Sequence, residues 1–167
     1  MKVELLAAIS VDGRIAESTD QLADWTSKED KRFFVRKTKE AGVLVMGKTT
    51  YETIGRPLPD RLNLIMTRNT SGLDQIEGQL EYTSSSPKEV LDDLERRGFQ
   101  TVVIAGGSQI YSLWLREGLV TDLFLTVEPV LFGGGVSLVN DVPSCKLELV
   151  SSEQLGEKSV LLHYKVL

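Results

Sequence analysis

The sequence predicts an α/β fold, a three-layer α/β/α sandwich with a mostly parallel central sheet and a C-terminal antiparallel strand pair. Short apolar runs of strand length alternate with longer helical patterns along most of the chain, the order that builds parallel β–α–β units. Near the C-terminus two strand-like runs, residues 146–150 and 160–166, follow one another without a helix, which favours an antiparallel pair. The 167 residues contain no repeat and no linker, so we expect one domain over residues 1–167.

The strand candidates are short and apolar. Residues 3–9 form the first β-compatible run, and Asp12 and Gly13 follow it as a turn signal. Continuous apolar runs are typical of strands that are buried on both faces of a parallel sheet. Further runs of this kind are residues 43–46, 62–66, 101–105 and 122–127.

Helical patterns lie between these strands. The longest begins at Ser27 and ends at Gly42, a residue type that commonly terminates helices in the left-handed conformation. Another begins at Pro87, after a serine run, and ends at Gly98. Shorter helical segments are expected after Gly47 and from Ser108 to Arg116. Polar or glycine-rich loops are expected over residues 16–24, 68–85 and 133–135.

Composition argues against several classes of protein. Hydrophobic residues make up 41% and charged residues 26%, which is typical of a globular domain rather than a disordered chain. No apolar run approaches the roughly 20 residues of a membrane span, and a net charge of −5 does not favour nucleic-acid binding. The single cysteine, Cys145, suits a reducing compartment, and the single histidine, His163, does not suggest a metal site. We therefore expect a cytoplasmic protein without a metal.

Phosphate-suited residues follow several predicted strands, at the edge of the sheet where ligands bind in α/β folds. Gly106 and Gly107 lie between a strand and a helix, where the backbone can approach a ligand and free N–H groups can bind phosphate. A second segment of this type is Gly47, Lys48, Thr49 and Thr50. After a third strand, Arg68 is placed to bind a 2′-phosphate, which favours NADPH over NADH. Each segment also has an ordinary interpretation, as a tight turn or a solvated charge.

Asp30 and Arg61 each have two interpretations from sequence alone. Asp30 lies three residues after Ser27, which is the spacing of a helix N-terminal cap. It also shares a helical face with Phe34 and lies near Trp25, where a carboxylate could bind a protonated heterocycle and support its protonation. Arg61, which follows a proline-rich loop, is either part of a connector or a fork for a ligand carboxylate.

In their order and spacing, four segments resemble the dihydrofolate reductase family. They are residues 6–15, 45–59, 61–63 and 104–111. The resemblance implies NADPH-dependent reduction of 7,8-dihydrofolate to 5,6,7,8-tetrahydrofolate, an activity of tetrahydrofolate biosynthesis and one-carbon metabolism. It implies hydride transfer to C6 of the pterin, with Asp30 as the catalytic carboxylate that promotes protonation at N5.

The resemblance also assigns binding residues. The substrate-binding residues would be Ala8, Phe34, Ile54, Leu58, Arg61 and Thr126. The cofactor-binding residues would be Ala8, Ile15, Gly47, Lys48, Thr49, Thr50, Met66, Thr67, Arg68, Gly106, Gly107, Ser108, Gln109 and Ile110. Arg61 would bind the carboxylate of the substrate's glutamate tail, Thr126 would hydrogen-bond Asp30, and a cis peptide would join Gly106 to Gly107.

Some segments depart from the dihydrofolate reductase pattern. Residues 16–24 do not match its usual loop, and residues 25–30 and 131–135 are more similar to the reductase of riboflavin synthesis. An alternative function is therefore NADPH-dependent reduction of a ribosylaminopyrimidinone phosphate, and another is a non-catalytic nucleotide-binding domain. The departures leave open whether Glu29 or Asp30 is the functional carboxylate, and whether the protein is a monomer or a homodimer.

Overall fold

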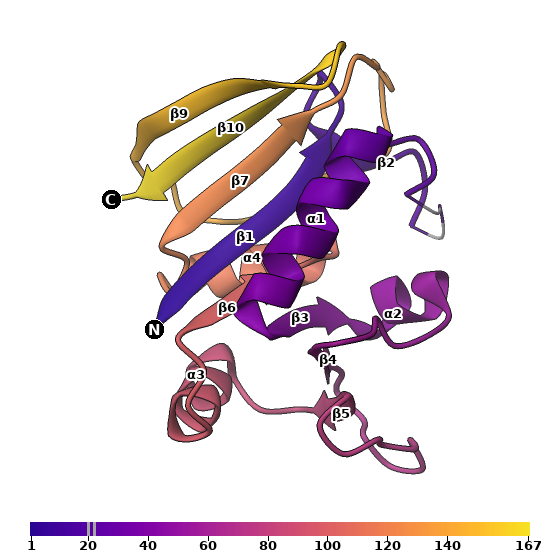
Figure 1. Ribbon diagram of the computed structural model, residues 1–167, viewed down its shortest axis with the longest axis vertical. Helices are drawn as coiled ribbons and strands as arrows, with labels where there is room; N and C mark the ends of the chain where they lie inside the picture. The colour runs from indigo at the N-terminus through magenta and orange to yellow at the C-terminus, as the bar shows by residue number, and fades with distance from the viewer. Residues whose placement is uncertain (20, 22) are drawn as a thin grey trace.

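The computed structural model describes residues 1–19, 21 and 23–167, which form a twisted sheet with helices on both faces (Figure 1). The strands are β1 (Lys2–Ile9), β2 (Arg14–Ala16), β3 (Val43–Gly47), β4 (Leu62–Met66), β5 (Leu80–Thr83), β6 (Thr101–Ile104), β7 (Asp122–Val127), β8 (Val136–Ser137), β9 (Leu147–Leu155) and β10 (Ser159–Val166). The helices are α1 (Lys28–Ala41), α2 (Lys48–Ile54), α3 (Pro87–Arg96) and α4 (Ser108–Arg116).

Within the described residues, the main sheet has eight strands in the order β5-β4-β3-β6-β1-β7-β10-β9. The six strands from β5 to β7 are parallel to one another. Strand β10 is antiparallel to both of its neighbours, β7 and β9. Strand β9 forms one edge of the sheet. A separate pair, β2 and β8, lies beside the carboxyl end of β1. The predicted parallel sheet with a C-terminal antiparallel pair is therefore confirmed.

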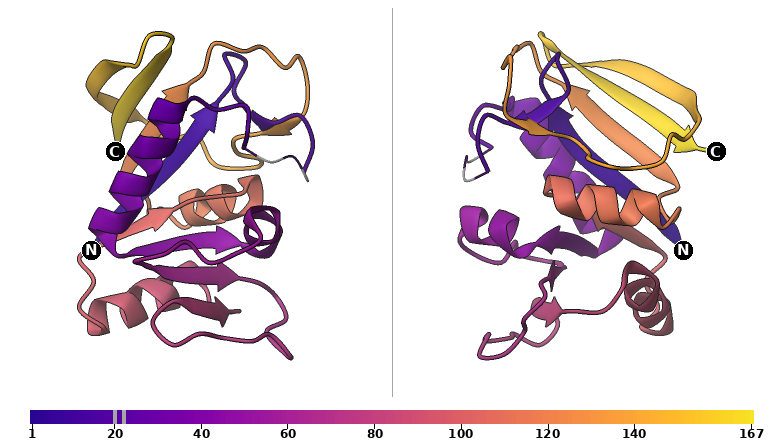
Figure 2. Two further views of the ribbon diagram at one scale, coloured as in Figure 1. Left: turned by 45° about the vertical axis from the view of Figure 1, so that its right-hand side comes forward. Right: turned by 180° about the vertical axis from the view of Figure 1, so that it is seen from behind.

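The core has two layers, one on each face of the sheet, and helices cover both faces (Figure 2). Helices α3 and α4 cover one face, where Trp114 is fully buried beside Leu5 of β1. Helices α1 and α2 cover the other, where Phe33 packs with Leu6. Because Leu5 and Leu6 are consecutive and both buried, β1 has no solvent-facing side at this point, as expected of a central parallel strand.

Helix termini explain why the helices begin and end where they do. The Ser27 side chain accepts a hydrogen bond from the N–H of Asp30 and caps α1, and Gly42 ends the helix with φ of 74°. Ser86 and Glu89 form a reciprocal capping box at the start of α3. These boundaries agree with the predicted ones.

Three short strands were not predicted, and all have weak local signals. Strands β2 and β8 pair with each other across more than a hundred residues, and β5 lies in a segment predicted to be a polar loop. Strand β9 extends to Leu155, beyond the predicted end at residue 150. The sequence pattern missed the added residues because they are mostly polar. In the described part of the chain, no helix is both long and apolar enough to cross a membrane.

Candidate active site

Asp30 lies in the first turn of α1, which packs beside the carboxyl end of β7. The hydroxyl groups of Thr126, on β7, and Thr26, just before α1, interact with its carboxylate. Both threonines are buried, with Thr126 only 2% exposed. Ala8 of β1 is directly opposite Thr126 in the sheet, so this predicted substrate-binding residue lies close to the carboxylate. The sheet thus brings together residues that are distant in sequence.

The environment of Asp30 favours its protonated form. Burial raises the pKa of Asp30 above the ordinary value, and the negative charge of Glu128 adds to the increase. The hydroxyl groups of Thr126 and Thr26 and the charge of Lys31 lower the pKa and offset part of this effect. A carboxyl group of this kind can hold a proton at a higher pH than an exposed aspartate, which suits proton donation to a bound substrate.

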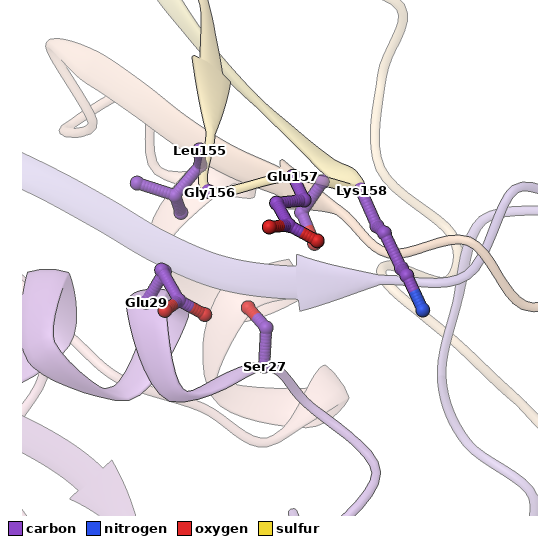
Figure 3. A pocket seen from close by; sticks show the side chains of 7 residues that line it. Ser27, Glu29, Leu155, Gly156, Glu157 and Lys158 are labelled. Atoms are coloured by element: carbon purple, nitrogen blue, oxygen red, sulfur yellow. The ribbon is translucent and has the colours of Figure 1, made fainter.

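The structure separates Asp30 from its neighbour Glu29. Glu29 points toward the turn between β9 and β10, where a Cβ on Gly156 would lie 2.9 Å from Glu29 Cγ (Figure 3). A hollow of about 300 Å³ lies there, and Lys158 also lines it. Two carboxylates, those of Glu29 and Glu157, line this hollow together with the one lysine, so the hollow does not suit an anionic ligand. Of the two candidates, it is Asp30 that faces the sheet.

Glycines bring the ends of β3 and β6 into close contact. The N–H of Gly47 donates to the carbonyl oxygen of Gly106 at 2.8 Å. A Cβ on Gly47 would lie 3.0 Å from Ile110 Cγ1, and one on Gly107 would lie 3.2 Å from Thr50 Oγ1. The expected cis peptide joins Gly106 to Gly107. The predicted segments at the starts of α2 and α4 therefore adjoin each other.

This arrangement fits a dinucleotide cofactor. Gly107 caps α4 without a side-chain hydrogen bond, so the first N–H groups of the helix are available to a phosphate. Around it, Thr49, Arg68 and Gln109 are exposed, while Ile15, Thr50, Thr67 and Ile110 are half-buried.

Among the described residues, four predicted cofactor-binding side chains have partners within the protein. The hydroxyl of Thr67 donates to the carbonyl oxygen of Asn69 at 3.3 Å. Lys48 forms an ion pair with Glu52. The hydroxyl of Ser108 accepts a hydrogen bond from Asn140 Nδ2 at 2.8 Å. The sulfur of Met66 accepts one from Trp114 Nε1 at 3.4 Å, so this side chain points into the core. A contact from Met66 to a cofactor would therefore come from its backbone.

Arg61 is held rigidly beside α1. It is 6% exposed, its Nε donates to the carbonyl oxygen of Pro59 at 2.8 Å, and its Nη1 donates to Thr38 Oγ1. Asn63 fixes the preceding loop, because its side chain hydrogen-bonds both the N–H and the carbonyl of Leu58. The predicted apolar substrate residues come from three places: Phe34 on α1 and Leu58 in the loop before β4 are half-buried, and Ile54 at the end of α2 is exposed.

Sequence reasoning missed several residues that support the site. Thr26 is the second hydroxyl at Asp30, and Thr38 holds Arg61. The hydroxyl of Tyr111 donates to the carbonyl oxygen of Leu6 at 2.6 Å and fills the space beside Gly106. Tyr111 belongs to a segment already singled out in the sequence, whereas Thr38 carried no signal beyond its polar character on a helix.

Residues 2–138 match the family model for dihydrofolate reductase. The chain belongs to the dihydrofolate reductase family. Members of this family with similar sequences include dihydrofolate reductase HdrB of Haloferax volcanii, 34% identical over 73% of this chain and 63% of the relative. The uncharacterized protein YwjB of Bacillus subtilis is 24% identical over 98% of this chain and 97% of its own.

Solved structures with a similar fold include proteins with names other than dihydrofolate reductase. A putative riboflavin biosynthesis protein from Shewanella sp. PV-4 has a TM-score of 0.84 and 22% identity, covering 100% of this chain and 99% of its own. A diaminohydroxyphosphoribosylaminopyrimidine deaminase/5-amino-6-(5-phosphoribosylamino)uracil reductase from Thermotoga maritima has a TM-score of 0.79 and 17% identity, covering 99% of this chain and 56% of its own. At these identities the likeness concerns the fold. Together with the family match, it identifies an oxidoreductase of the dihydrofolate-reductase-like fold.

Proposed function

We propose that the protein reduces 7,8-dihydrofolate to 5,6,7,8-tetrahydrofolate with NADPH. The observation that carries the proposal is the half-buried carboxyl group of Asp30, which interacts with Thr126 and has a raised pKa. A pterin ring carries N–H groups that such a carboxyl group can bind, and its reduction requires a proton at N5. Arg61 donates a hydrogen bond to Thr38, which lies one turn after Phe34 on α1. From there its guanidinium would receive the carboxylate of a glutamate tail.

In this proposal the protein orients the reactants and controls the proton. NADPH supplies the hydride that C6 of the pterin receives. The Gly106 and Gly107 backbone and the first N–H groups of α4 would hold the cofactor phosphates. Asp30 would bind the pterin and hold a proton near N5, with Thr26 and Thr126 fixing the orientation of its carboxyl group. Because ionisation of Asp30 removes this proton, the rate should fall as pH rises through its pKa.

The test is an assay of NADPH oxidation by the purified protein with dihydrofolate between pH 5 and 8. We expect Asp30→Asn to lower the turnover rate by about 10²-fold or more at neutral pH without changing the affinity for NADPH. Glu29→Gln is the matched control, because this neighbouring carboxylate points away from the sheet. Absence of turnover by the unaltered protein throughout this pH range would contradict the proposal, and loss of activity in Glu29→Gln alone would move the catalytic role to Glu29.

A second candidate function is reduction of a ribosylaminopyrimidinone phosphate. It is favoured by the two riboflavin-type structures described above, which cover nearly the whole chain, including the C-terminal strands beyond residue 138. That substrate carries a phosphate and no glutamate tail, so it gives Arg61 no carboxylate to bind. If neither substrate is turned over while NADPH binds, the non-catalytic nucleotide-binding alternative is supported instead.

Arg61 distinguishes the two enzymatic functions. For dihydrofolate, Arg61→Ala should raise KM by about tenfold to a hundredfold, because a charge-assisted, bidentate contact is lost, while the KM for NADPH stays unchanged. Arg56→Ala removes an exposed arginine from the same loop and serves as the control. An unchanged KM for dihydrofolate in Arg61→Ala, together with turnover of the ribosylaminopyrimidinone phosphate, would favour the second function.

A further inference from the structure

Glu128 is a buried carboxylate that joins three elements. It directly follows β7 and is 3% exposed. Its Oε1 accepts hydrogen bonds from the N–H of Ser27 at 2.8 Å and from the Ser27 hydroxyl at 2.7 Å. Its Oε2 accepts one from the hydroxyl of Ser159, the first residue of β10, at 2.5 Å. The end of β7, the start of β10 and the start of α1 therefore meet at this one side chain.

This carboxylate has no basic partner within 4.0 Å among the residues that the structure describes. Burying a charge without a paired cation is costly, and hydrogen bonds from hydroxyl and backbone donors compensate only in part. The N-terminus of α1 adds some compensation, because its dipole favours negative charge. A neutral residue would fasten the same three elements at a lower cost, which points to a use for the charge itself.

A continuous chain of hydrogen bonds links Glu128 to Asp30. The Ser27 hydroxyl donates to Glu128 and accepts from the backbone N–H of Asp30 at 3.1 Å. Figure 3 shows Ser27 at the start of α1, directed toward the turn between β9 and β10. The position of Asp30 in the first turn therefore depends on the same hydroxyl that Glu128 holds.

We propose that Glu128 is a positioning residue for Asp30, which it acts on in two ways: it fixes the start of α1 through Ser27, and it places a second negative charge beside the site. The proposal rests on the proposed role of Asp30 as the group that holds the proton for reduction.

The other groups that face Asp30 do not supply the same effect. Lys31, on the same helix, lowers the pKa of Asp30, and so do the hydroxyl groups of Thr26 and Thr126. Tyr111 approaches from α4, and burial together with the charge of Asp30 raises its pKa, so its hydroxyl stays neutral. Among the described residues, Glu128 is the charged group near Asp30 that opposes its ionisation, in addition to burial itself.

The experiment is a titration of the Asp30 carboxyl group by ¹³C NMR in the full-length protein, alongside the pH profile of dihydrofolate reduction. Glu128→Gln keeps an oxygen that accepts from Ser27 but removes the charge. We expect the pKa of Asp30 to fall by about one unit, and the rate above the wild-type midpoint to fall about tenfold, with unchanged NADPH affinity. An Asp30 titration that Glu128→Gln leaves unchanged overturns the proposal.

Two further variants separate charge from structure. Ser159→Ala removes one hydrogen bond to Glu128 but leaves its charge and its contacts with Ser27, so it should lower stability without moving the titration of Asp30. Should Glu128→Gln not fold, Ser27→Ala tests the hydrogen-bond chain: kcat should fall several-fold with unchanged NADPH affinity, and an unchanged kcat overturns the proposal. If the unaltered protein does not reduce dihydrofolate, the proposed function fails, and the NMR titration still decides whether Glu128 controls Asp30.

Discussion

Asp30 connects the proposed chemistry to the stability of the fold at the scale of a single residue. Burial raises its pKa above the ordinary value of 3.8. A group whose pKa is higher in the folded than in the unfolded state stabilises the fold below the unfolded-state pKa, and this contribution is lost as pH rises through the folded-state pKa. Above the folded-state pKa, the ionised carboxylate therefore lowers the stability of the protein. The residue that supplies the proton is kept at the expense of stability.

We therefore expect Asp30→Asn to be more stable than the unaltered protein at pH 7, although it is far less active. Asparagine has nearly the same shape as aspartate, and no charge is buried. The difference in the free energy of unfolding should shrink as pH falls below about 4, where the aspartate of the unaltered protein is also neutral. Urea unfolding at pH 7 and pH 3.5 measures it, with Glu29→Gln as the control. An asparagine variant that is less stable at pH 7 would contradict this prediction.

At the scale of elements, the pair β2 and β8 positions the loops beside the candidate site. Asp12, in the turn before β2, accepts hydrogen bonds from the N–H groups of Phe132 and Gly133, before β8. The hydroxyl of Ser10 and these backbone donors lower the pKa of Asp12 to about 2, so it stays a charged acceptor across the physiological range. Both loops are thereby fixed near Ile15, a predicted cofactor-binding residue.

Gly135 is the glycine on which this pair depends. Its φ is 96°, and a Cβ there would collide with the carbonyl oxygen of Ala16, so Gly135→Ala combines backbone strain with a clash. We expect a loss of about 2–4 kcal/mol in the free energy of unfolding. Gly133→Ala is the matched control, because Gly133 also has a positive φ, 72°, but nothing lies within 4 Å of its Cβ position. Urea unfolding measures both variants. Equal losses of unfolding free energy would contradict the prediction, because they would mean that the clash at Gly135 costs nothing.

At the scale of the whole molecule, the sequence predicts what depends on local pattern and misses what depends on distant pairing. The apolar runs of the central strands and the caps Ser27 and Gly42 are local features, and they predicted the sheet and α1 correctly. Asp30 was a candidate because its helical face and its family spacing are visible in the chain. Glu128 was not, because its partner Ser27 lies 101 residues away and meets it only when β7 has joined the sheet.

The contrast between the centre and the edge of the sheet gives a prediction for the whole fold. Leu5 and Leu6 of β1 are 0% and 4% exposed and face opposite layers of the core, so Leu5→Ala and Leu6→Ala should each cost about 2–5 kcal/mol. Leu149 and Val150, also consecutive, lie on the edge strand β9 and are 54% and 48% exposed, so their alanine variants should each cost less than about 1 kcal/mol. Urea unfolding of the four variants measures both pairs. Successive side chains of a strand point to opposite faces of the sheet. A large loss in the free energy of unfolding for only one of Leu5→Ala and Leu6→Ala would therefore mean that the helical layer on the other face contributes little to stability.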